Sequence, residues 1–77
     1  MLWLMEEMIW IYKTNVSVAT DFTALRRLLD NTPGIQTWSI DLEDCDKVLR
    51  VVAKGIQSKD VVDMLVSCQV QATELPY

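Results

Sequence analysis

The sequence predicts a single α+β domain in which two helices cover one face of a four-stranded sheet. Within residues 35–54, two runs of alternating apolar and polar residues flank a short acidic turn, and this period-2 pattern predicts an antiparallel hairpin at the centre of the chain. Each arm outside the hairpin adds one strand-like and one helix-like run, so the order is strand, helix, strand, strand, helix, strand. With 77 residues, 51% of them hydrophobic, the chain is long enough for one core.

The first strand is expected over Met8–Val16, a run rich in β-branched and aromatic residues. Its alternation gives one face to Trp10, Tyr12, Thr14 and Val16. The preceding residues 1–7 are apolar but contain two glutamates and no basic residue, so they are too short and too acidic for a signal peptide or a membrane span. We therefore expect one domain over residues 1–77, with residues 1–7 as an N-terminal extension.

The first helix follows a short polar connection. Thr20 or Asp21 is its expected N-cap, because either side chain can accept hydrogen bonds from the free amides of the first turn. Helical spacing places four apolar residues on one side, namely Phe22, Leu25, Leu28 and Leu29. The breakers Pro33 and Gly34 end the helix before the hairpin begins.

The hairpin and the elements after it continue the same division into core and outer faces. In the hairpin the expected core positions are Trp38, Ile40, Leu42, Leu49, Val51 and Ala53. The second helix is expected to be capped by Ser58 and to bury Val61, Val62, Leu65 and Val66. The last strand is expected over Cys68–Leu75, with Cys68, Val70 and Ala72 inward and Gln69, Gln71 and Thr73 outward.

Right-handed crossovers arrange these elements in one antiparallel sheet of order 4-1-3-2, with both helices on the same face. This is the ferredoxin-like βαββαβ two-layer sandwich. Because the helices cover only one face, the opposite face of the sheet is expected to meet water.

A domain of this size, with a short loop opening its first helix and DLEDCDKVLRV as its hairpin, resembles the heavy-metal-associated family of copper-chaperone-like domains. The resemblance spans about Met8 to Leu75. It implies a soft monovalent ion bound by the two cysteines of an MxCxxC motif in the loop after the first strand. Residues 14–21 of this chain contain no cysteine, and hard hydroxyl or carboxylate oxygens do not replace thiolates for Cu(I). We therefore expect a family-like domain without the metal motif, and without a cofactor.

Catalysis and nucleic-acid binding are both disfavoured by composition. The chain has no histidine, which excludes Ser–His and Cys–His nucleophile pairs, and its two glycines form no phosphate-binding loop. The net charge is −4 and the basic residues are scattered, so nucleic acid is a poor partner. We expect a protein that is not an enzyme.

Two cysteines and an acidic turn are the remaining candidate ligands. Cys45 and Cys68 show no CxxC spacing, and without a secretion signal they are expected to be reduced thiols of a cytoplasmic protein. A metal site using Cys45 and Cys68 is one alternative function. The carboxylates of the hairpin turn are expected to be solvated, or to steer docking toward a basic surface; they are Asp41, Glu43, Asp44 and Asp46.

The open face of the sheet is the strongest candidate for function. The predicted topology places an apolar patch there, beside Lys13 and Arg50; the patch consists of Ile9, Ile11, Val48 and Val52. We expect an interaction or self-association domain that forms a homodimer or binds a protein partner through this face. The alternatives are self-association through the edge strands, cover of the patch by Leu2, Trp3 and Leu4 of the same chain, and a small-molecule-binding regulatory domain.

Overall fold

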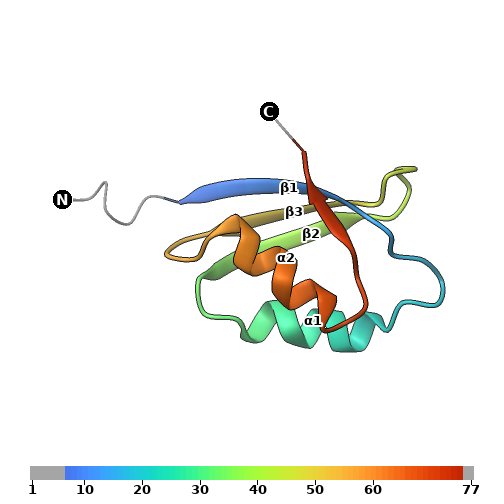
Figure 1. Cartoon of the computed structure of the whole chain (residues 1–77), viewed down its shortest axis with the longest axis horizontal. Coiled ribbons are helices and arrows are strands. Elements are labelled where there is room, and N and C mark those ends of the chain that lie inside the picture. The colour runs from blue at the N-terminus through green and yellow to red at the C-terminus, as the bar shows by residue number, and fades with distance from the viewer. Residues whose placement is uncertain (1–6, 76–77) are drawn as a thin grey trace.

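The computed structural model describes residues 7–75, which form a sheet with both helices packed on one of its faces (Figure 1). The elements are β1 (Met8–Thr14), α1 (Phe22–Asn31), β2 (Ile35–Asp41), β3 (Val48–Ala53), α2 (Ser58–Val66) and β4 (Ala72–Glu74). The sheet order is β2-β3-β1-β4, which is the predicted order read from the other edge and confirms the ferredoxin-like fold. The expected cover by Leu2, Trp3 and Leu4 lies outside the described residues.

All strand pairs are antiparallel, with β1 and β3 at the centre. β1 pairs with β3 from Met8 opposite Ala53 to Tyr12 opposite Leu49. β4 pairs only with the last part of β1, from Tyr12 opposite Glu74 to Thr14 opposite Ala72. The two central strands therefore supply both the core on the helix side and the middle of the open face.

The core lies between the sheet and the two helices, as the alternation predicts. The buried apolar residues are Tyr12, Val16, Leu25, Leu29, Leu49, Val51, Ala53, Val61, Leu65 and Val70. Every strand residue among them belongs to the inward set predicted from the sequence. Burial of these side chains is the main favourable term for folding a domain of this size.

The two helices begin differently. At α1 the carboxylate of Asp21 accepts a hydrogen bond from the backbone N–H of Ala24 at 3.0 Å, as expected for an N-cap. At α2 the expected cap was wrong, because Gln57 is the N-cap and Ser58 is the first helical residue. The hydroxyl of Ser58 is used by the sheet instead, where it contacts the side chains of Tyr12 and Glu74.

The segment after α2 differs most from the prediction. Residues 67–69 form a helix-ending turn rather than a strand, so β4 is limited to Ala72–Glu74. Gln69 adopts a left-handed φ of 61°, and the N–H of Val70 reaches back to the carbonyl of Leu65 at 3.1 Å. These are features of a Schellman motif, and Val70 and Leu65 are both buried in the core.

Two expected core residues are exposed. Val66 is 59% exposed, since the buried side of α2 is set by Val61 and Leu65 and Val66 lies past it at the last helical position. Leu42 is 48% exposed, because β2 ends at Asp41 and the chain has already entered the turn. Within residues 7–75, none of the helices has the length and apolar character needed to cross a membrane.

Candidate functional site

The open face of the sheet holds the residues predicted to form an interaction patch. Ile9 of β1 lies opposite Val52 of β3, and Ile11 lies opposite Arg50. Ile9 is 43% exposed, while Ile11 and Val52 are half-buried by their neighbours. The structure therefore places these three aliphatic side chains together on the face that the helices leave uncovered.

Val48 is on the same face but apart from the other three. Positions 48, 50 and 52 of β3 alternate with the buried residues Leu49 and Val51, so Arg50 stands between Val48 and Val52. Val48 itself lies opposite Asp41 at the end of β2. Its neighbours are thus charged residues, and it forms the border of the apolar group rather than part of it.

Leu75 extends the apolar group on the other side and was missed at the sequence level. Its N–H donates to the carbonyl of Ile11 at 2.7 Å, so the two residues are neighbours across β1 and the end of β4. The side chain of Glu74 reaches Ser58 on the helix side, so alternation directs Leu75 to the open side. The sequence contained a signal for this, because Thr73 is predicted to face outward and residues two positions apart in a strand share a face. We call Ile9, Ile11, Val52 and Leu75 the open-face cluster.

Charges of both signs border the open-face cluster. Arg50 is exposed, and Lys13 forms an ion pair with Asp46 of the hairpin turn at 3.8 Å. The side chains of Lys13 and Asp46 are 58% and 45% exposed, so this pair contributes little to stability. The face therefore combines an apolar centre with a mixed polar border, which is the usual composition of a protein interface.

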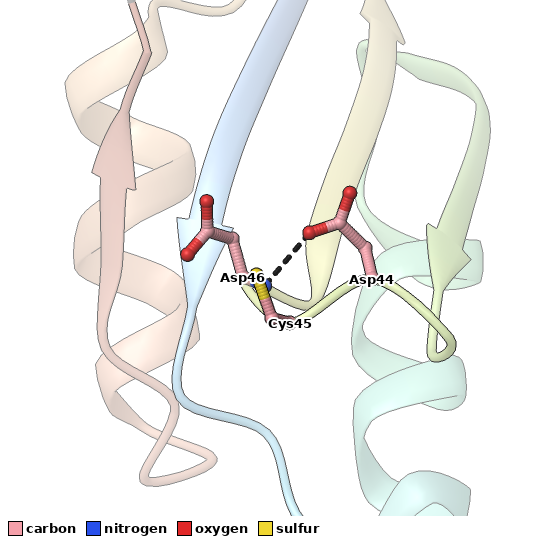
Figure 2. Close-up of side chains that lie close together, drawn as sticks. All are labelled: Asp44, Cys45 and Asp46. Atoms are coloured by element: carbon pink, nitrogen blue, oxygen red, sulfur yellow. Dashed lines mark hydrogen bonds between the residues drawn. The ribbon is translucent and has the colours of Figure 1, made fainter.

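At one end of the sheet the hairpin turn brings three possible metal ligands together, as Figure 2 shows for Asp44, Cys45 and Asp46. One ligand atom from each lies within 4.8 Å of the others. One carboxylate oxygen of Asp44 already accepts the backbone N–H of Asp46 at 2.7 Å, which closes the turn. One thiolate and two carboxylates would suit a borderline divalent ion better than Cu(I).

Cys68 is not part of this group. It lies in the turn after α2 and lines an open hollow of about 420 Å³ together with Ser67, Gln69 and residues of the β1–α1 loop. Among the described residues, no cluster of three metal-ligating side chains contains both Cys45 and Cys68. The structure does not bring the two thiols into a shared site.

The β1–α1 loop, where the resembling family holds its ion, is closed by its own hydroxyl groups. The Thr20 hydroxyl accepts the N–H of Ser17 at 2.9 Å, and the Ser17 hydroxyl accepts the N–H of Ala19 at 3.2 Å. Together with the capping carboxylate of Asp21, these oxygens satisfy backbone amides of the loop and of the first turn of α1.

On the helix side, a chain of hydroxyl groups joins the sheet to α2. Ser58 donates to Glu74, so its oxygen is free to accept the Tyr12 hydroxyl at 2.9 Å. Burial raises the pKa of the Tyr12 phenol above its ordinary value, and Glu74 adds to this while the Ser58 hydrogen bond opposes it. Tyr12 is therefore neutral at physiological pH, and its role is structural.

Comparison with known proteins gives one strong structural likeness. A solved structure described as "The apo form of HMA domain of copper chaperone for superoxide dismutase" superposes with a TM-score of 0.77 and 19% sequence identity, covering 94% of this chain and 70% of that chain. No protein-family model matches the sequence, and no curated protein matches it. The likeness shows that this chain has the fold of an HMA domain over nearly its whole length.

Proposed function

We propose that this chain is a non-catalytic interaction domain that pairs with a second copy of itself through the open face of its sheet. The observation that carries the proposal is the open-face cluster, in which Ile9 meets Val52 across the two central strands and Leu75 adjoins Ile11. Contiguous apolar groups of this kind on a face without helices are typical of interfaces.

The polar border supports a second copy as the partner. A two-fold axis makes an interface self-complementary, so each charge must find the opposite sign on an identical surface. Arg50 supplies a positive group beside the cluster, and Asp41 and Asp46 supply negative groups at the hairpin end of the same sheet. The alternative partner is a different protein whose surface also combines an apolar centre with charges of both signs.

The proposal that the domain is not catalytic rests on the residue types present and on the hydrogen bonds they make. The sequence contains no histidine, and the hydroxyl and carboxylate groups of the β1–α1 loop accept hydrogen bonds from nearby backbone amides. The resemblance to metal-binding domains extends to the fold, while residues 14–21 offer no sulfur to a soft ion.

Sedimentation velocity over a range of protein concentrations tests the proposal. The wild type is expected to show a monomer–dimer equilibrium, and Ile11→Glu is expected to be monomeric, because it places a charge in the centre of the apolar face. Thr23→Glu adds the same charge to an exposed position in the first turn of α1 and is expected to behave like the wild type. A wild type that stays monomeric at the highest concentration would show that self-association is wrong.

A further inference from the structure

A second apolar surface lies at the hairpin end of the molecule, away from the open-face cluster. The β1–α1 loop and the β2–β3 turn lie at the same end of the sheet in Figure 1. Between them is an open hollow of about 240 Å³, which is lined by Val16, Ser17, Val18, Phe22, Leu42 and Lys47. Four of these six side chains are apolar, and they come from the β1–α1 loop, the first residue of α1 and the β2–β3 turn.

Val18 and Leu42 make this hollow unusual, because they are exposed apolar residues held in fixed positions. Val18 is fully exposed at 105% and Leu42 is 48% exposed. The N–H of Thr20 donates to the carbonyl of Ser17 at 3.0 Å, so Val18 stands inside a hydrogen-bonded turn. A lone exposed valine needs no explanation, but Val18 groups with Phe22 and Leu42 at one hollow, and a grouped apolar surface is typical of an interaction site.

The hairpin turn behind Leu42 is fixed just as firmly. The carboxylate of Asp41 accepts the N–H groups of Glu43 and Asp44 at 3.0 and 3.3 Å. The N–H of Thr14 donates to the carbonyl of Asp46 at 3.0 Å, which ties the turn to β1. The hollow is therefore formed before anything binds, and a preformed site avoids the entropy cost of ordering loops on binding.

The charge around the hollow selects the kind of partner. Four carboxylates lie within six residues of the turn, namely Asp41, Glu43, Asp44 and Asp46. Lys47 lines the hollow and keeps its charge while it donates to the carbonyl of Asp44 at 3.2 Å, and Lys13 is paired with Asp46. Because the four carboxylates outnumber these two ammonium groups, the turn keeps a net negative charge. A second copy of this end would bring two acidic turns together, and an anionic membrane surface would also be repelled.

We propose that this hollow is a docking site for a basic segment of another protein, which inserts one large apolar side chain between Val18 and Leu42 while its lysines or arginines face the acidic turn. The apolar contact supplies affinity, and the charges supply orientation and a faster association rate. This site goes beyond the proposed self-association, since its apolar contacts and its partner are different; the two surfaces share only the carboxylates of Asp41 and Asp46.

The test uses the full chain and fluorescently labelled synthetic peptides in which lysines flank a single central residue. Fluorescence anisotropy is expected to show binding of the phenylalanine peptide, at least roughly tenfold tighter than the alanine peptide, which corresponds to one buried anchor side chain. Binding is expected to weaken as salt is added, because charges at the surface are screened. No binding of the phenylalanine peptide, or equal binding of both peptides, would overturn the proposal.

Matched variants locate the binding site. Leu42→Ser and Val18→Ser replace exposed residues, so both are expected to fold and to lose peptide affinity roughly tenfold. Val66→Ser makes a similar change at an exposed position outside the hollow and is expected to bind like the wild type. Equal loss in Val66→Ser, or full affinity in Leu42→Ser, would contradict the assignment. Ile11→Glu is expected to keep peptide affinity even if it abolishes self-association, which separates the two proposals.

Discussion

The hydroxyl of Tyr12 lies 2.9 Å from the hydroxyl of Ser58, so the central strand β1 is joined to the first residue of α2. The Ser58 oxygen also contacts Glu74 of β4, and three elements meet at this point. Tyr12 itself is fully buried in the core. The contact adds a side-chain link to the backbone pairing that holds the three-residue strand β4 beside β1.

Tyr12 is expected to make the domain sensitive to alkaline pH. Its pKa is raised in the folded protein, so the folded state holds the phenolic proton at a pH where the unfolded chain releases it at about 10. The stability linked to this group is fully present below pH about 10 and is lost as the pH rises above that value.

Urea unfolding at several pH values between about 8 and 11 measures this loss. The difference in unfolding free energy between the wild type and Tyr12→Phe isolates the contribution of the phenol from that of the lysines. Tyr12→Phe is expected to be less stable by about 1 kcal/mol near neutral pH and to lose less stability at high pH. Parallel curves for the two proteins would show that Tyr12 does not titrate with a raised pKa.

Adjacent residues of α2 are expected to differ sharply in their contribution to stability. Leu65 is fully buried while Val66 is 59% exposed. Leu65→Ala is expected to lower the free energy of unfolding by about 2–5 kcal/mol, a large share of the total for a small domain. Val66→Ala is expected to change it by about 0.5 kcal/mol or less. Similar losses for both variants, measured by urea unfolding, would mean that α2 is rotated about its axis.

The sequence was sufficient to predict the element order, the sheet order and the inward faces of the strands, because alternation and helical spacing report burial directly. It did not show where β4 begins. Apolar and polar residues alternate along Cys68–Leu75, and this pattern is compatible both with an extended strand and with a turn at residues 67–69. The turn is marked by the left-handed conformation of Gln69 and by backbone hydrogen bonds from residues 67–70 to α2 carbonyls, and glutamine carries no sequence preference for that conformation.

The sequence predicts which residues share the open face, but it does not predict which of them are neighbours across the strands. The structure brings Ile9, Ile11 and Val52 together on the open face. Alternation along β3 already sets Arg50 between Val48 and Val52, but the partners across the strands, Arg50 for Ile11 and Asp41 for Val48, depend on the pairing register. The hollow between Val18 and Leu42 is formed by two loops, and periodicity says nothing about how loops approach one another.

Metal binding provides a clear test of the distinction from metal-carrying domains. Reduced protein titrated with Cu(I) in the presence of a competing chelator is expected to take up no stoichiometric metal, because Cys45 and Cys68 do not share a site and residues 14–21 contain no cysteine. Cys45→Ser and Cys68→Ser are expected to give the same titration curve as the wild type. A one-to-one complex that disappears in Cys45→Ser would assign the chain a role in metal handling.

A dilution series followed by NMR on methyl-labelled isoleucine, leucine and valine tests the proposed function most directly. If the open face pairs with a second copy, the methyl resonances of Ile9, Ile11, Val52 and Leu75 will shift with protein concentration, while those of Val61 and Leu65 in the core will not. Resonances that stay constant up to the highest concentration, or shifts confined to Val66 and the helix side, would contradict the account.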